Sequence, residues 1–153
     1  MNKPRRRSRT SIEFAHTAAT HVGRVRQSNQ DAYGSIPDLC VLADGMGGHR
    51  GGEVAASLAV STTLERFDGS SLGGLVRAVA TANRIILERS LADEDLRGMG
   101  TTICAMAAVV GESGSDRLAV ANVGDSRVYR HATGELTQVT EDHSLVADLV
   151  RAG

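Results

Sequence analysis

Aromatic residues are almost absent from this 153-residue chain, where they make up 3% of the sequence and include no tryptophan. The core must therefore be built from Val, Leu, Ile and Ala, within a hydrophobic content of 41%. No apolar run approaches the roughly 18 residues that suggest a membrane span. The formal net charge is −1, so nothing in the overall charge favours a nucleic-acid partner. We expect one globular, monomeric domain without a membrane or nucleic-acid partner.

Cysteine is also scarce, and the two cysteines, Cys40 and Cys104, both lie in apolar runs. We expect buried free thiols in a reducing cytoplasm, without a disulfide framework. Residues 1–10 have no apolar centre, so they do not form a secretory signal. They carry five basic residues with little to bury, which predicts a disordered tail ahead of a domain at 11–153.

One stretch organises the rest of the chain. Leu39–Ala43 is apolar throughout and predicts a short strand buried on both faces. It ends on Asp44, and five glycines follow within the next eight residues. Glycines allow a backbone to approach a ligand closely. A plain strand-to-helix turn with a solvated Asp44 is the alternative interpretation.

A hairpin is predicted around this strand. Ala32–Ile36 and Leu39–Ala43 flank the turn residues Pro37 and Asp38. If the two strands pair, Asp31 and Asp44 come together at the end away from the turn. Two carboxylates held that close are unfavourable without a cation between them. The hairpin therefore gives a first indication of a metal site.

The remaining pattern favours an α+β layered fold, because two helices are grouped between runs of strands. Helical periodicity covers Glu53–Phe67 and a second segment from Leu75 to about Leu91. The acidic stretch Asp93–Asp95 is interpreted as a solvated loop. Further strands are expected at Ile12–Thr20, Ile103–Val110, Leu118–Val123, Val128–His131 and Leu136–Val139, and a helix is expected to start within Thr140–Ser144.

Five motifs occur in a recognisable order. They are Arg26 with Gln30-Asp31, Asp44–His49, Gly98–Thr102, Asn122–Arg127 and Leu136–Ser144. In order and spacing the chain, from about Ile12 to Gly153, resembles the metal-dependent PPM (type 2C) serine/threonine protein phosphatases of bacteria. An α+β domain with unrelated turn aspartates is the alternative.

This resemblance implies a fold and a reaction. The fold is a PPM phosphatase-like sandwich of two antiparallel β-sheets flanked by helices, in an α-β-β-α order. The reaction is hydrolysis of phosphoserine and phosphothreonine in proteins, by a water or hydroxide bridging two Mn²⁺ or Mg²⁺ ions, with a third ion in many bacterial members. The partners implied are phosphoproteins and a serine/threonine kinase.

The resemblance also implies roles for individual residues. Asp44 matches the carboxylate that bridges two ions, and Gly45 matches a backbone-carbonyl ligand. Asp31 matches a carboxylate beside the second ion, and Asp125 matches a ligand of the third. Arg26 matches the arginine that binds the substrate phosphate, for which its forked guanidinium is suited.

Two positions depart from the family pattern. Gln30 stands where some members have Glu, which weakens one water-mediated contact. Met46 stands where the animal branch has a histidine proposed as general acid. His49, three residues later, is a candidate for that role, and a turn histidine without catalytic function is an equal alternative.

The length is the largest departure, because the chain matches only about the first three-fifths of the family's domain. The later part of the domain supplies two further Asp ligands. We therefore expect a C-terminally incomplete domain, and a truncated form that is weakly active or inactive. A non-catalytic module that binds a kinase or a phosphoprotein is the alternative function.

Overall fold

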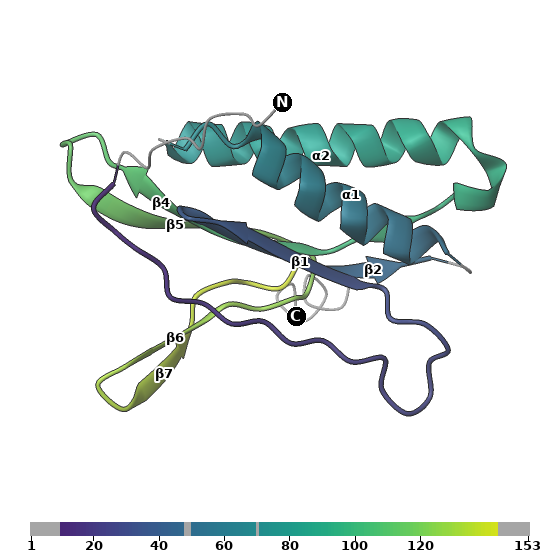
Figure 1. Cartoon of the computed structure of the whole chain (residues 1–153), viewed down its shortest axis with the longest axis horizontal. Coiled ribbons are helices and arrows are strands. Elements are labelled where there is room, and N and C mark those ends of the chain that lie inside the picture. The colour runs from purple at the N-terminus through teal and green to yellow at the C-terminus, as the bar shows by residue number, and fades with distance from the viewer. Residues whose placement is uncertain (1–9, 48–49, 70, 144–153) are drawn as a thin grey trace, which may run out of the picture.

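The computed structural model describes residues 10–47, 50–69 and 71–143. Within them, two helices lie on one side of a five-stranded antiparallel sheet, and a two-stranded hairpin lies on the other side (Figure 1). This is the expected α+β arrangement of two antiparallel sheets with helices. The elements are β1 (Asp31–Ile36), β2 (Leu39–Met46), α1 (Gly51–Arg66), α2 (Leu72–Ala92), the 3-10 helix η1 (Glu94–Leu96), β3 (Gly100–Thr101), β4 (Ile103–Val110), β5 (Asp116–Val123), β6 (Tyr129–Ala132) and β7 (Glu135–Gln138).

The sheet has the strand order β1-β2-β4-β5, and the short β3 pairs with the end of β2. The hairpin predicted around Pro37 and Asp38 is confirmed. Its register pairs Ile36 with Leu39 beside the turn and Asp31 with Asp44 at the far end. Both carboxylates therefore lie at one end of the hairpin.

Helix α1 packs closely on β1 and β2 because small residues line the contact. Ala55, Ala56 and Ala59 are buried on the inner side of the helix. Opposite them, a Cβ at Gly34 would lie only 2.8 Å from Cδ1 of Leu64. A larger residue at position 34 would push α1 away from the sheet.

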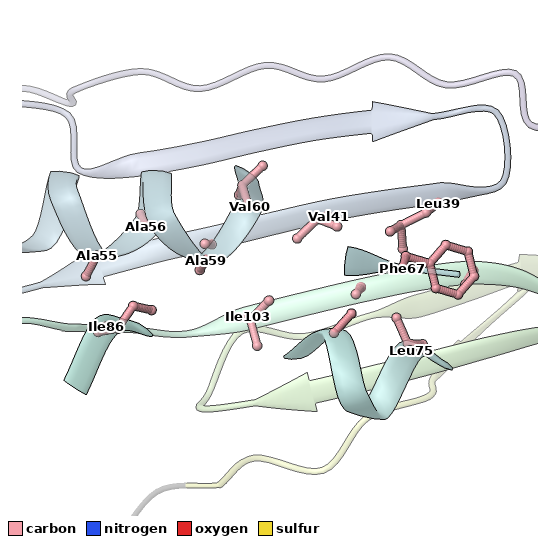
Figure 2. Packing of buried hydrophobic residues seen from close by; sticks show 14 of the residues in the cluster. Leu39, Val41, Ala55, Ala56, Ala59, Val60, Phe67, Leu75, Ile86 and Ile103 are labelled. Carbon is pink, nitrogen blue, oxygen red and sulfur yellow. The ribbon is translucent and has the colours of Figure 1, made fainter. Parts of the chain in front are cut away.

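The core lies between the helices and the sheet, and it is aliphatic as the composition predicted. Leu39 and Val41 of β2, Leu75 of α2 and Ile103 of β4 belong to one buried cluster (Figure 2). Burying one such side chain stabilises the fold by about 1.5–3 kcal/mol. Helix α2 begins at a capped end, where the backbone N–H of Gly74 donates to the Ser71 hydroxyl at 3.0 Å.

The prediction that β2 is buried on both faces is wrong. Leu39, Val41 and Ala43 point into the core, whereas Cys40 is half-buried and Leu42 is 46% exposed. The reason is the two-residue period of a strand in a sheet that helices cover on one side only. We call the other side the open face; the β6–β7 hairpin lies on that side (Figure 1).

The open face carries apolar side chains, and they line a cavity that lies away from the predicted metal ligands. A cavity of about 670 Å³ on this face is lined by residues that include Tyr33, Cys40, Leu42, Cys104 and Tyr129. Both cysteines are free, as expected; Cys104 is buried as predicted, whereas Cys40 is only half-buried.

The strand predicted at Ile12–Thr20 is also wrong. This segment passes along the open side of the sheet (Figure 1), and no described residue pairs with it in a β-ladder. Side chains hold it instead, because Ser11 donates to the Asp116 carboxylate and His16 Nε2 lies 2.6 Å from the Ser35 hydroxyl. Weak alternation without a ladder partner does not make a strand.

Other predictions have mixed outcomes. The stretch Asp93–Asp95, expected as a loop, contributes to the single 3-10 turn of η1, with Asp93 as its cap. The helix expected near Thr140–Ser144 is not present at 140–143, and its remainder lies outside the described residues, as does nearly all of the basic tail at 1–10. Among the helices in the described ranges, none is long and apolar enough to cross a membrane.

Candidate metal centre

The β1–β2 hairpin brings two of the predicted ligands face to face. Asp31 and Asp44 are directly opposed partners in the register. Partial burial raises the pKa of Asp44, and the negative charges of Asp31 and Asp125 raise it further. The positive charge of Arg26 lowers that pKa. Arg26, Asp31 and Asp125 are therefore each close enough to act on Asp44.

The Asp31 carboxylate is oriented by residues that the sequence did not single out. The Thr20 hydroxyl donates to Asp31 Oδ2 at 2.7 Å, and the Asn29 amide donates to that hydroxyl at 2.8 Å. The Asn29 side chain also accepts from the Asp31 backbone N–H at 3.1 Å. These contacts fix the rotamer of Asp31 at the end of β1. A polar loop offers no sequence signal for them beyond its hydrogen-bonding residue types.

Gly45 sits where a side chain cannot fit. A Cβ there would lie 2.1 Å from the Gly52 carbonyl oxygen and 2.7 Å from the Gln30 carbonyl oxygen. The Gly45 N–H donates to that same Gln30 oxygen at 3.1 Å. The glycine-rich stretch therefore lets the end of β2, the start of α1 and the loop before β1 meet.

The backbone of Asp44 is held from both sides by two threonines. The Thr101 hydroxyl and the Thr102 N–H each donate to the Asp44 carbonyl at 2.9 Å. The Asp44 N–H donates to the Thr102 hydroxyl at 3.0 Å. Both threonines belong to the Gly98–Thr102 motif, for which the sequence predicts no individual role.

Arg26 lines an open cleft of about 410 Å³ beside the carboxylate pair. Gln30, Gly45 and Met46 also line this cleft, and the Met46 side chain is largely exposed. The guanidinium of an arginine can form paired hydrogen bonds to the oxygens of a carboxylate or a phosphate. Gln30 and Gly45 are the chain neighbours of Asp31 and Asp44, so the cleft adjoins the carboxylate pair.

Asp125 lies in the turn after β5, and it is exposed. The turn is fixed by the Gly124 carbonyl, which accepts from the His143 N–H at 2.9 Å and from the Asn122 amide at 3.4 Å. Arg127 forms a bidentate ion pair with Asp142, at 2.8 and 2.6 Å. Asp142 is therefore a partner of this turn.

The donor set fits a hard divalent cation in part. Asp31 and Asp44 offer carboxylate oxygens, and Gly45 offers a backbone carbonyl, which are the ligand types that Mn²⁺ and Mg²⁺ prefer. Across residues 10–47, 50–69 and 71–143, no three His, Cys, Asp or Glu side chains are grouped as a metal site. Asp125 is thus near the pair without joining it. His49, the candidate general acid, lies outside the described residues.

Comparisons with known proteins agree on one family. A family model described as protein phosphatase 2C matches residues 19–148. The serine/threonine protein phosphatase PstP of Mycobacterium tuberculosis is 37% identical over 150 residues, which cover 95% of this chain and 28% of PstP. The serine/threonine phosphatase stp of Listeria monocytogenes is 37% identical over 147 residues, which cover 88% of this chain and 56% of stp. The chain thus spans between about a quarter and somewhat over half of these relatives.

Solved structures give the same result for the fold. The catalytic domain of PstP, crystallised in complex with two manganese ions, is similar with a TM-score of 0.74 and 40% identity, over 86% of this chain and 56% of that one. The phosphatase Stp1 of Staphylococcus aureus has a TM-score of 0.73 and 30% identity, over 99% of this chain and 62% of that one. The chain belongs to the protein phosphatase 2C family.

Proposed function

We propose that this chain carries the N-terminal, metal-binding part of a Mn²⁺- or Mg²⁺-dependent protein serine/threonine phosphatase site. The observation that supports it most strongly is the direct pairing of Asp31 with Asp44, with Arg26 acting on the same carboxylate. Opposed carboxylates repel each other, and a divalent cation between them removes that repulsion.

Each residue has a physical task in this proposal. Asp44 and Asp31 hold the cations with the Gly45 carbonyl, and Asp125 serves a further, looser cation. Bound divalent ions supply Lewis-acid activation of water and neutralise charge at the phosphoryl group. Arg26 binds the phosphoryl oxygens through its paired N–H donors. His49 as general acid rests on the sequence alone.

The substrate class and partners follow from the relatives. PstP and stp are named as serine/threonine phosphatases, which supports phosphoserine and phosphothreonine in proteins as the substrate groups. A serine/threonine kinase that produces them is the matching partner. The two free thiols support a reducing, cytoplasmic location for this chain.

The test is hydrolysis of p-nitrophenyl phosphate and of a phosphothreonine peptide with Mn²⁺, comparing the chain with Asp44→Ala. Because the described residues supply only one opposed carboxylate pair, we expect specific Mn²⁺ binding and turnover no faster than in Asp44→Ala. Clear Mn²⁺-dependent turnover above that control would show that this chain is a complete enzyme. Absence of Asp44-dependent Mn²⁺ binding would contradict the proposal itself.

A second candidate is a non-catalytic module that binds a phosphoprotein or a kinase. It is favoured by the lack of a three-residue metal cluster in the described part of the chain. In that case a phosphothreonine peptide binds with an affinity that Arg26→Ala reduces, and the peptide is recovered unhydrolysed. Equal binding of the unphosphorylated peptide would exclude this candidate.

A further inference from the structure

The ladder between β2 and β4 is altered at one position beside the carboxylates. The register pairs Leu42 with Cys104 and Gly45 with Thr101, so Asp44 stands opposite Thr102. In a hydrogen-bonded antiparallel pair, each backbone N–H donates to the partner's carbonyl. Here the Thr102 N–H does donate to the Asp44 carbonyl, but the Asp44 N–H donates to the Thr102 hydroxyl, at 3.0 Å.

The Thr102 carbonyl lies beside a hydroxyl in place of the Asp44 N–H. The Thr101 hydroxyl lies 2.9 Å from both the Thr102 carbonyl and the Asp44 carbonyl. The side chain of Thr102 has therefore taken over a main-chain function. A hydroxyl is required for that, because a methyl group in its place would leave the Asp44 N–H without this acceptor.

The same side chain also contacts the turn that carries Asp125. The Thr102 hydroxyl lies 2.7 Å from the Ser126 hydroxyl. On the other side of Asp125, a Cβ at Gly124 would lie 2.8 Å from the Thr102 methyl carbon, and Gly124 has a φ of +101°. Thr102 thus touches the residues immediately before and after Asp125.

We propose that Thr102 is a positioning residue, whose hydroxyl fixes the Asp44 strand end and the Asp125 turn relative to each other. It links the carboxylate pair to the turn that carries Asp125 through Asp44 N–H, Thr102 Oγ1 and Ser126 Oγ. Metal sites require their ligands within about 0.5 Å of the productive geometry. Residues that orient ligands typically change metal affinity by about 10–100-fold. This inference rests on the proposed divalent-cation function.

Three variants separate the hydroxyl from the shape of the side chain. Thr102→Val keeps the branched shape and removes the hydroxyl, whereas Thr102→Ser keeps the hydroxyl and removes the methyl. Ser126→Ala removes only the link to the turn. Thr81→Val is the matched control, because the Thr81 hydroxyl donates to the Arg77 carbonyl on α2 and lies outside the site.

The experiment measures Mn²⁺ affinity by calorimetry and, without metal, hydrogen exchange of the Asp44 amide. We expect Thr102→Val to weaken Mn²⁺ binding by about 10-fold and to speed Asp44 exchange. Thr102→Ser and Thr81→Val should leave both close to the parent values. Ser126→Ala should weaken binding by less and leave Asp44 exchange unchanged. Urea unfolding of each variant separates these effects from a general loss of stability.

The outcomes are distinguishable. If Thr102→Val matches Thr81→Val in both measurements, or if Thr102→Ser is as impaired as Thr102→Val, the positioning role is overturned. If the parent chain binds no Mn²⁺, the proposed function fails instead. Hydrogen exchange then still decides whether the Thr102 hydroxyl holds the Asp44 strand end.

Discussion

The two faces of the central sheet are built from the same strands but are covered very differently. On the helix-covered face Leu39 and Ala43 are fully buried, whereas on the open face Leu42, Tyr33 and Leu118 are 46%, 50% and 55% exposed. The helix-covered face thus contributes most of the buried apolar area and so most of the hydrophobic stabilisation. The carboxylates of the candidate site belong to the register positions of the open face. Stability and proposed chemistry are therefore separable by substitution along one strand.

The largest difference between the faces is expected for two leucines of β2. Leu39→Ala removes a fully buried side chain and should lower the free energy of unfolding by about 2–5 kcal/mol. Leu42→Ala, three residues along on the open face, should cost about 1 kcal/mol or less. Urea unfolding of the two variants measures this directly. Equal losses would mean that the open face is covered as well as the helix face.

Gly45 tests the close contact between the end of β2, the start of α1 and the loop before β1. A Cβ at this position meets backbone oxygens of Gly52 and Gln30, so Gly45→Ala should cost about 1–3 kcal/mol and disturb Mn²⁺ binding. The matched control is Gly73→Ala on α2, where the nearest atom belongs to the flexible Arg77 side chain. An alanine there should be neutral or stabilising by about 0.5–1 kcal/mol. A tolerated Gly45→Ala would show that the glycine contact is not needed.

The open-face carboxylates predict a pH dependence. The pKa of Asp44 is raised in the folded chain, so the folded state binds a proton more readily than the unfolded state. Stability of the metal-free chain should then fall as pH rises from the unfolded pKa through the folded pKa. Asp44→Asn should raise the melting temperature at pH 7 without metal, and the gain should vanish in acid. A variant that is less stable than the parent at pH 7 would contradict the raised pKa, whose causes are first the partial burial of Asp44 and then the charge of Asp31.

The smallest expected effect concerns the thiols. Burial raises the pKa of both Cys40 and Cys104, so each carries less reactive thiolate at neutral pH than a free cysteine. Alkylation by iodoacetamide, followed by mass spectrometry, should be slow at pH 7. Cys104 should react more slowly than Cys40, because it is more buried and its thiol donates to Oδ1 of the Asn122 side chain at 2.9 Å. Reaction as fast as glutathione would contradict this.

Much of the helix-covered half could be predicted from the sequence, because its signals are local. Two strand-like runs on either side of Pro37 and Asp38 predicted the hairpin, and the hairpin predicted the pairing of Asp31 with Asp44. Helical periodicity predicted both helices to within a few residues. The same patterns could not show whether one face of β2 is covered or both, since an apolar run is compatible with either arrangement.

The contacts that orient the site could not be predicted, because they join residues far apart in the chain. Thr102 meets Asp44 across 58 residues and Ser126 across 24. Thr20 reaches Asp31 from a segment that was predicted as a strand. Hydroxyl residues are common in loops, and only the folded chain shows which of them bind a ligand-bearing backbone.

Mn²⁺-induced broadening of assigned backbone amide signals tests the metal site most directly. If a cation binds between the paired carboxylates, substoichiometric Mn²⁺ broadens the amides of Asp31, Asp44 and Gly45 first. Ser35 and Cys40, near the turn of the same hairpin, should persist, and Asp44→Asn should abolish the effect. Broadening that begins at the acidic stretch Asp93–Asp95, or that is unchanged in Asp44→Asn, would contradict a metal site at the end of the hairpin that carries Asp31 and Asp44.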